Sequence, residues 1–550
     1  MKKLISSVKN IIYRRSASFD WAKVITKSDK KWDEFVSEAK NGRRILIATS
    51  MGCYDAGLVL ESLISVALTL RGAELSFFLC DDLLSVCQMA KISSDVPARL
   101  VHQGKTQRCH NCFKSGREFY QPLGLNIFRF SEFVSKAEIT KAEDISSTVP
   151  LAQIKDYEYE GLSVGEHAYA GVLRYYGRGE LENDSYCEKI SRMYLRAAML
   201  TVFATRGLLK KHKFDCVVFH HGIYVPQGLI GEVLRQEGVR VINWNHAYRK
   251  QSFIFSHNDS YHHTMISEPV SAWENIKWTP EIEDKTLKYL KSRWQGTDDW
   301  IWFHEKPVED VKKIAKELGI DFNKPCVGML TNVMWDAQLH YQSNAFKCML
   351  DWVFQTIEYF VERPDLQLII RIHPAEIRGL VPSRQKLADE INKKYKILPE
   401  NIFIILPESQ VSTYAVMEKC NAVLIYNTKT GIELASLGIP VVVAGEAWIR
   451  NKGFSLDASN PNEYFKILNR LPLPERMGKE QTQRALKYAF HFFFRRMLQV
   501  PYVVMPKKLG FTLSISSLKD LMPGMCRCLD LICQGILTNS AFIYDAENAR

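Results

Sequence analysis

Residues 43–80 read RRILIATSMGCYDAGLVLESLISVALTLRGAELSFFLC and carry the strongest evidence on fold class. An apolar run at 43–50 leads into a glycine-containing turn at 51–57. A helical pattern at 58–72 follows, and then a second apolar run at 73–80. Strand, turn, helix and strand in this order form a βαβ unit, which implies a parallel sheet.

The same alternation returns further along the chain. Apolar runs occur at 213–220, 239–244, 326–331, 366–373, 402–406, 422–426 and 440–444. Residues 270–320 are polar, rich in tryptophan and poor in strand signals, so we expect helical connectors there. We therefore predict an α/β protein with two Rossmann-like domains that face a cleft.

These patterns divide the chain into five parts. We expect a basic N-terminal helical segment at 1–40, a Rossmann-like domain at 41–270, a helical connector at 271–320, a second Rossmann-like domain at 321–480 and a helical tail at 481–550.

Composition and charge exclude several classes of protein. The 550 residues include 72 Lys+Arg and 61 Asp+Glu, a net charge of +11, and 46% are hydrophobic. This balance is typical of a globular protein. No apolar run reaches the roughly 18–20 residues that span a bilayer, so we expect no integral membrane protein. The charge is diffuse and no nucleic-acid-binding motif occurs, so we expect no nucleic-acid partner.

The first 15 residues carry five positive charges and no negative ones. Their apolar residues follow a helical period, which leaves two interpretations: a helix on an anionic membrane surface, or a solvated helix docked on the body. They lack the apolar core of a secretory signal. We therefore expect a cytoplasmic protein with free thiols, with a peripheral contact at the inner face of the plasma membrane as one interpretation.

Cys109 and Cys112 have the spacing of half a zinc site. A structural zinc site needs four ligands, and no second Cys-x-x-Cys follows at a suitable distance. A tight loop with two small buried residues is the favoured interpretation, and we assign no metal ligand.

Chemistry-bearing residues follow two strands of the second series. Arg371 and His373 stand two apart at the end of the 366–373 run, with Glu376 just beyond Pro374. A guanidinium and an imidazole at a strand end suit a phosphate or diphosphate. A strand terminus with an ion-paired arginine is the alternative.

The loop after the 422–426 run contains Thr428, Lys429 and Thr430 and opens a helix. Its hydroxyls, ammonium and backbone N–H groups suit the phosphate of a sugar nucleotide, and Glu433 could receive ribose hydroxyls. Thr430 and Glu433 also fit a capping box, which is the competing interpretation.

Candidate bases occur in the first Rossmann-like domain. Asp55 stands at the head of a helix, either as an N-cap or as a base for an acceptor hydroxyl. His220, His221 and His246 follow strands, where an imidazole could deprotonate an acceptor. No Walker A loop, dinucleotide fingerprint or hydrolase motif is present.

The order of motifs resembles the bacterial capsule polysaccharide biosynthesis family. The resemblance lies in Asn332-Val-Met-Trp-Asp336, Arg371-Ile-His-Pro-Ala-Glu376 and Asn427-Thr-Lys-Thr-Gly-Ile-Glu433 with Gly438-Ile-Pro440, over about residues 325 to 450. The family groups GT-B glycosyltransferases, including the Kdo transferases of capsule export systems.

The resemblance implies that the chain transfers a sugar from a nucleotide-activated donor to a glycan or lipid-linked acceptor. No metal held by an Asp-x-Asp motif would be needed, and the donor, CMP-linked in Kdo transferases, would be a substrate rather than a cofactor. His373 and the 428–433 loop would hold the donor, with Arg371 and Glu376 as weaker additions. The first domain would supply the acceptor site and the base.

Rival functions stay open at this point. A polyol-phosphate transferase or a sugar-nucleotide epimerase also uses twin Rossmann-like domains. A non-catalytic glycan-binding or assembly subunit of a surface-polysaccharide complex would keep the donor loop without using it.

Overall fold

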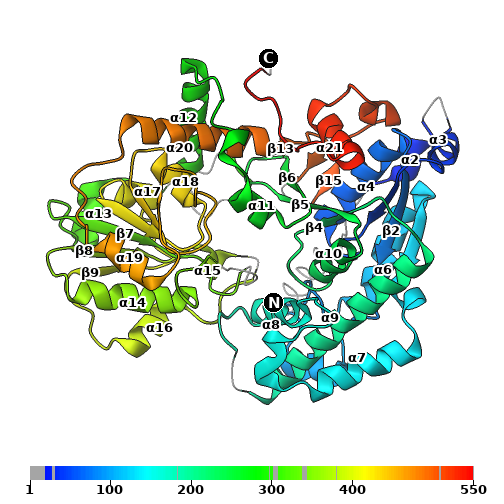
Figure 1. Ribbon diagram of the computed structural model, residues 1–550, viewed down its shortest axis with the longest axis horizontal. Helices are drawn as coiled ribbons and strands as arrows, with labels where there is room; N and C mark the ends of the chain where they lie inside the picture. Colours follow the sequence, from blue (N-terminus) through cyan, green and yellow to red (C-terminus); the bar gives the residue numbers. More distant parts are fainter. Residues whose placement is uncertain are drawn as a thin grey trace, which may run out of the picture.

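The computed structural model describes residues 19–27, 31–181, 184–295, 298–300, 307–336, 343–379, 381–506 and 510–548. The basic segment 1–15 lies outside the described residues. Two α/β lobes stand side by side (Figure 1). At the top of the N-terminal lobe, the blue helices near the start of the chain lie next to the red helix α21 near its end. Among the helices described, none combines the length and apolarity needed to cross a bilayer.

The N-terminal lobe is built on a seven-stranded sheet in the order β13-β6-β5-β4-β1-β2-β3. Its strands are β1 (Arg44–Ile47), β2 (Glu74–Leu79), β3 (Asn126–Arg129), β4 (Cys216–His220), β5 (Arg240–His246), β6 (Ser252–His257) and β13 (Leu498–Gln499). β1 to β5 are parallel, and the β5–β6 and β6–β13 pairs are antiparallel. The order of the parallel strands reverses between β1 and β4, a point where α/β sheets bind ligands.

The C-terminal lobe contains a six-stranded parallel sheet in the order β12-β11-β10-β7-β8-β9. Its strands are β7 (Cys326–Leu330), β8 (Gln367–Arg371), β9 (Ile402–Ile405), β10 (Ala422–Ile425), β11 (Val441–Val443) and β12 (Leu456–Asp457); a separate hairpin pairs β14 (Val503–Val504) with β15 (Thr512–Leu513). Together the two sheets confirm the predicted pair of Rossmann-like domains.

Helices cover both faces of each sheet. Those of the N-terminal lobe are α2 (Trp21–Ile25), α3 (Trp32–Ala39), α4 (Asp55–Thr69), α5 (Pro97–Gln103), α6 (Cys109–Tyr120), α7 (Lys136–Thr148), α8 (Val164–Tyr176), α9 (Ser185–Lys211), α10 (Gln227–Gln236) and α11 (Tyr261–Ser267). The connector contains α12 (Pro280–Gln295) and α13 (Val311–Leu318). The C-terminal lobe and tail contain α14 (Met349–Val361), α15 (Ala375–Arg378), α16 (Leu387–Lys394), α17 (Thr413–Met417), α18 (Thr430–Ala435), α19 (Pro461–Leu468), α20 (Lys479–Phe490) and α21 (Arg527–Thr538).

Short helical turns complete the chain. They are η1 (Gln121–Leu123), η2 (Phe130–Phe133), η3 (Leu151–Asp156), η4 (Val270–Ala272), the π-helical η5 (His491–Arg496) and η6 (Leu518–Leu521). All strands expected from the apolar runs are present. The strands β3, β6 and β12, the strands β13, β14 and β15 of the tail predicted as helical, and the helical insertion α5–α9 between β2 and β4 were not predicted.

Helix α4 is mostly apolar and is covered on two sides. Every residue from Ala56 to Thr69 is buried, between the sheet and the C-terminal helix α21. A helix without a polar face needs such complete burial. The tail therefore completes the core of the N-terminal lobe.

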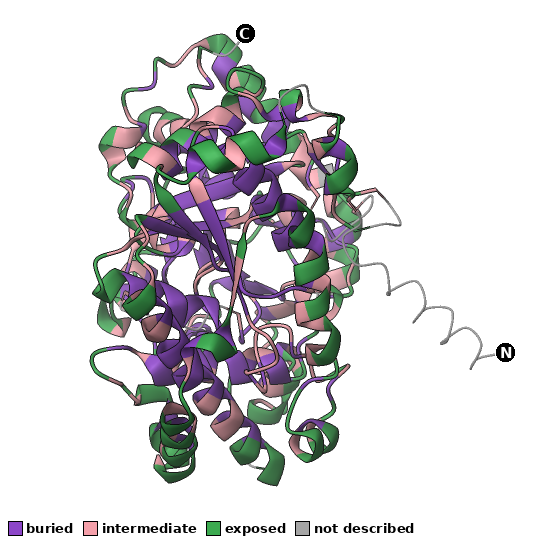
Figure 2. Cartoon of the chain, turned by 90° about the vertical axis from the view of Figure 1, so that its right-hand side faces the viewer, coloured by how far each residue is buried: buried purple, intermediate pink, exposed green. Residues whose placement is uncertain are grey.

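The tail crosses back from the C-terminal lobe to the N-terminal lobe. Leu498 of β13 pairs with Phe253 of β6, and α21 packs on α4. Phe490, Phe492 and Phe493, just before the crossing, are fully buried. Figure 2 shows this pattern across the lobe, with buried strands inside and exposed faces on the outer helices.

If the tail is part of this core, replacing Ile532 in α21 should destabilise the protein. Ile532 is fully buried, and an Ile532→Ala substitution removes about 3 kcal/mol of stability through lost burial and a cavity. Urea unfolding measures the loss. Gln534→Ala, an exposed position on the same helix, serves as the control. Equal stability of the two variants would contradict a structural role for α21.

Candidate functional site

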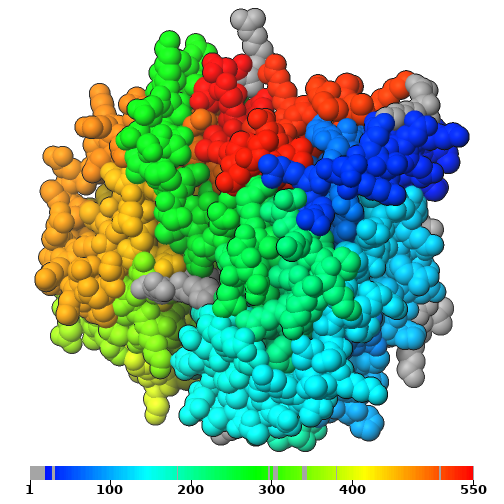
Figure 3. Space-filling model, turned by 45° about the vertical axis from the view of Figure 1, so that its right-hand side comes forward, coloured from blue at the N-terminus to red at the C-terminus, as the bar shows by residue number. Residues whose placement is uncertain are grey.

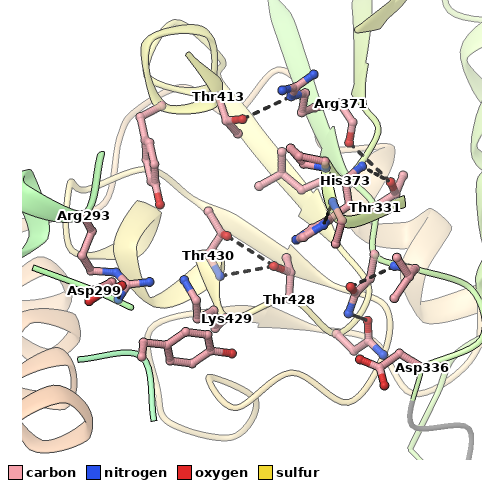
Figure 4. A pocket seen from close by; sticks show the side chains of 18 of the residues that line it. Arg293, Asp299, Thr331, Asp336, Arg371, His373, Thr413, Thr428, Lys429 and Thr430 are labelled. Atoms are coloured by element: carbon pink, nitrogen blue, oxygen red, sulfur yellow. Dashed lines mark hydrogen bonds and ion pairs between the residues drawn. The ribbon is translucent and has the colours of Figure 1, made fainter. Parts of the chain in front are cut away.

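A cavity of about 400 Å³ lies at the carboxyl ends of β7, β8 and β10, where the C-terminal lobe faces the N-terminal lobe. The C-terminal lobe lines it with Leu330, Thr331, Asn332, Val333, Asp336, Arg371, His373, Pro374, Ala375, Ser412, Thr413, Tyr414, Asn427, Thr428, Lys429, Thr430 and Trp448. The N-terminal lobe adds Tyr248, Tyr261 and His262, and the connector adds Arg293, Trp294, Asp299 and Pro307. Figure 4 shows the polar side chains around this space.

His373 and Arg371 both line the cavity, as their position after β8 predicted. The His373 N–H donates to Thr331 Oγ1 at 3.2 Å, and His373 Nδ1 accepts a hydrogen bond from the Ala375 N–H at 3.0 Å. Since Nδ1 is the acceptor, Nε2 carries the ring proton and is a hydrogen-bond donor. The imidazole is thus fixed as a donor.

Arg371 is held by the backbone of the β9–α17 segment. Its guanidinium donates to the carbonyl oxygens of Leu406 and Ser409 and, at 3.3 Å, to Thr413 Oγ1. Only 2% of the residue is exposed. Burial, together with the charge of Arg378, lowers the pKa of Arg371 to about 10, so it stays cationic at neutral pH. These three hydrogen bonds fix the guanidinium at the end of β8, and the alternative of an ion-paired arginine stays a prediction.

The loop after β10 brings two hydroxyls to the cavity. Thr428 Oγ1 accepts from the Thr430 N–H at 3.4 Å and lies 3.3 Å from Thr430 Oγ1. Helix α18 then begins, and it has only six residues, so its dipole adds little to the hydroxyls. The predicted capping box is absent here: Lys429 is the N-cap residue and makes no side-chain capping bond.

Glu433 lies instead in a buried cluster of charges. Its carboxylate accepts from Lys429 Nζ at 2.9 Å and from the Tyr414 hydroxyl, and it lies 3.3 Å from Arg293 Nε. Arg293 in turn pairs with Asp299. Burial alone would raise the pKa of Glu433, but the charges of Arg293 and Lys429 hold it at about 2. The carboxylate is therefore ionised and already occupied.

Glu376 does not line the cavity. It is buried, and its Oε1 accepts from the Leu387 N–H at 2.9 Å, which ties α15 to the start of α16. Burial raises its pKa. This contact indicates a structural role for a residue predicted to hold the donor.

The four candidate bases of the N-terminal lobe do not line the cavity. Asp55 is the first residue of α4, and Tyr54 occupies the N-cap position, so the N-cap interpretation of Asp55 is wrong. His220 Nε2 lies 3.1 Å from the Tyr54 hydroxyl, and His246 Nδ1 lies 3.4 Å from it. Burial lowers the pKa of both histidines, to about 4 for His246. They form one neutral aromatic cluster at the edge of the sheet.

His221 contacts Tyr261, a residue that lines the cavity. Its backbone adopts φ +66°, a left-handed conformation that is costly for a residue with a side chain. Its ring stacks on Tyr224, with centroids 5.3 Å apart, and approaches Tyr261. The Tyr224 hydroxyl donates to Asp336 Oδ1 at 3.1 Å, across the two lobes. Burial, with the charge of Arg174, lowers the pKa of His221 to about 3.

Several cavity residues were not among the predicted site residues. His262 Nδ1 accepts from Trp448 Nε1 at 3.1 Å, so Nε2 carries the proton; burial lowers its pKa to about 3. Tyr248 lies in the turn between β5 and β6, and Tyr261 and His262 begin helix α11, where the sequence gives no strand-end motif. Asp336 belonged to a motif that carried the family resemblance, and its distance from β7 hid its position.

The Cys109–Cys112 pair lies in the first turn of α6, so the predicted tight loop is wrong. A Cβ at Gly52 would lie 2.0 Å from the Cys112 carbonyl oxygen, so the 51–54 loop packs directly on this helix. A hydrogen bond between the Cys53 and Cys112 thiols raises the pKa of Cys53 and lowers that of Cys112. In the described part of the chain, no three His, Cys, Asp or Glu side chains are arranged to hold a metal ion.

Comparison with known proteins gives one family match. Residues 306–480 match the family model described as "Capsule polysaccharide biosynthesis protein". No curated protein matches the sequence.

Similar solved structures include KpsC, a beta Kdo 2,4 transferase of Thermosulfurimonas dismutans, at 12% identity and a TM-score of 0.34, covering 56% of this chain and 87% of that chain. The UDP-GlcNAc 2-epimerase of Neisseria meningitidis, bound to UDP-GlcNAc, is 10% identical with a TM-score of 0.24 and covers 81% of this chain and 97% of that chain. Sucrose-phosphate synthase of Thermosynechococcus elongatus is 9% identical with a TM-score of 0.28 and covers 82% and 95%. Because these TM-scores are low, the fold assignment rests on the two sheets themselves.

The charge cluster gives a testable effect on stability. Glu433→Gln leaves Arg293 and Lys429 without their shared carboxylate and should cost about 3–5 kcal/mol at pH 7. The pKa of Glu433 is depressed to about 2, so its contribution is present above the unfolded pKa of about 4.3 and is lost as the pH falls toward 2. Denaturant unfolding of wild type and variant should therefore converge as the pH is lowered from 7 to 3. The exposed Glu418→Gln is the control, and a pH-independent difference would contradict the charge assignment.

Proposed function

Since residues 306–480 match the model of the capsule polysaccharide biosynthesis family, we propose that the chain is a glycosyltransferase. It would move a sugar from a nucleotide-activated donor to a growing surface glycan or a lipid-linked acceptor in the cytoplasm. The observation that carries the proposal is the meeting of His373, Thr428 and Thr430 in one cavity that residues of both lobes line.

The cavity's donors suit a phosphate group. His373 Nε2 carries a proton, and the hydroxyls of Thr331, Thr428 and Thr430 lie around the same space. Arg371 adds a positive charge, held by hydrogen bonds to Thr413 and to the Leu406 carbonyl. Hydrogen bonds to a leaving phosphate strengthen as negative charge develops on it, which is how such donors accelerate transfer.

Asp336 is the carboxylate best placed to act on an acceptor. It lines the cavity, and the Tyr224 hydroxyl orients it from the opposite lobe. In the proposed reaction the acceptor hydroxyl gives its proton to Asp336, and its oxygen bonds to the anomeric carbon. The bond from that carbon to the donor phosphate breaks, and the nucleotide leaves with the electron pair. His221, behind Tyr224, is the alternative base.

A thermal-shift screen with CMP, CDP, UDP, GDP and their sugar conjugates tests the proposal. A ligand at a hundredfold excess over its Kd should stabilise the native chain by about 2.7 kcal/mol. A selective shift identifies the nucleotide, and appearance of the sugar on an added acceptor separates transfer from epimerisation. The absence of any shift would favour a non-catalytic assembly subunit.

Removing the donor contacts should abolish the nucleotide shift without unfolding the chain. His373→Ala and Thr430→Val each remove one donor from the cavity and should weaken nucleotide binding about tenfold or more, since each lost hydrogen bond to a charged group costs about 1.5–3 kcal/mol. The melting temperature without ligand should stay within a few degrees of wild type. His102→Ala, on an exposed helix position, is the control; a large loss of stability with intact binding would indicate a purely structural role.

Asp336→Asn separates the base from the donor site. Loss of a general base should lower kcat by about 10²–10⁴ while the nucleotide-induced shift persists. The exposed Asp284→Asn is the matched control. If His221→Gln lowers kcat by the same factor while Asp336→Asn stays active, His221 rather than Asp336 is the base.

A further inference from the structure

A second pocket, of about 380 Å³, lies where the returning C-terminal tail meets the connector. Its cationic residues are Arg249, which follows β5, Lys285 of α12 and Arg527 at the start of α21. Phe494 and Tyr544 supply aromatic walls. In Figure 3 the C-terminal segment borders the connector on this side of the molecule.

The three cations of this basic pocket converge without a carboxylate among the described lining residues. Arg249 and Lys285 lie over the same Phe494 ring, 4.6 and 4.9 Å from its centroid. Burial lowers the pKa of Lys285, and the charge of Arg249 lowers it further, so the two cations repel each other. Two like charges on one ring favour an anion between them.

One acidic side chain of the tail, Glu547, is already engaged. Glu547 lies 3.2 Å from Arg495 Nε and does not line the basic pocket. Within the described ranges, Lys285 and Arg527 form no ion pair, and Arg249 donates one hydrogen bond, to the Phe493 carbonyl. The positive charge of the pocket is therefore available to a ligand.

An exposed apolar side chain adjoins the pocket. Met525 is 59% exposed and stands next to Cys526, which lines the pocket, just before Arg527. Met505, 46% exposed, follows the lining residue Pro501 on the neighbouring segment. Cations beside exposed apolar side chains are the combination that binds the boundary between lipid headgroups and acyl chains.

We propose that the basic pocket binds the phosphate of an anionic phospholipid headgroup and docks the chain on a membrane surface, with Met525 entering the interface. Charge complementarity supports the headgroup, and the exposed methionine favours a lipid over free phosphate. The pocket is lined by residues other than those of the proposed donor cavity. The proposal therefore does not depend on the proposed reaction.

Co-sedimentation of the full chain with vesicles tests the proposal. Wild type should bind vesicles that contain phosphatidylglycerol and not vesicles of phosphatidylcholine alone. The double variant Lys285→Ala/Arg527→Ala should partition roughly 30-fold more weakly, since each cation near an anionic surface contributes a factor of about five. Met525→Ser should weaken binding several-fold with the charge unchanged. Both cations are exposed, so the double variant should melt like wild type.

The matched control is Lys396→Ala/Lys419→Ala, which removes the same charge from exposed positions of the C-terminal lobe. Full binding by this control supports the pocket, whereas an equal loss would show that only net charge matters and would overturn the proposal. Wild-type binding that the Lys285→Ala/Arg527→Ala variant retains would also overturn it. Stabilisation of wild type by inorganic phosphate that is lost in this variant, with vesicle binding equal in both, would reassign the pocket to free phosphate.

Discussion

The buried carboxylate of Glu433, which pairs with two cations, holds the loop after β10 (residues 427–430) in place. Glu433 is fully buried, and its partners come from different parts of the chain: Lys429 from the loop itself and Arg293 from the connector. A buried charge without a partner is costly. As long as the Glu433 carboxylate is ionised, its contact with Arg293 therefore binds the connector to the C-terminal lobe. The hydroxyls of Thr428 and Thr430 are positioned by the same loop.

The ion pairs of Glu433 change which side chains of the cavity are available to bind a phosphate. The sequence predicted that Lys429 supplies the ammonium group of the loop after β10. In the structure this ammonium donates to Glu433. Burial, with the charge of Arg293, lowers the pKa of Lys429. Arg371 keeps its positive charge at the cavity, where imidazole and hydroxyl groups lie around the same space. Neutral donors cost less desolvation than cations when the cavity is empty.

The hydrophobic pattern of the sequence predicted the strands of both sheets and the residues at their ends. Site residues that long-range packing brings to the cavity were missed. Parallel strands buried on both faces read as continuous apolar runs, so the strands that build both sheets were found, and strand ends led to His373 and Thr430. The residues Tyr261, His262 and Arg293 come from antiparallel and helical segments, where no strand end marks the site. Glu433 fitted a capping box by spacing, but a buried partner 140 positions earlier in the chain, Arg293, sets its role.

The returning tail explains why the two lobes and the basic pocket belong to one architecture. Helix α4 is buried along its whole length, and α21 covers one of its sides. The core of the N-terminal lobe therefore includes a helix that follows the C-terminal lobe in the sequence. The crossing passes beside the connector, and this is where Arg249, Lys285 and Arg527 meet. Three segments that are distant in sequence thus form a single positive surface because the first lobe needs the last helix.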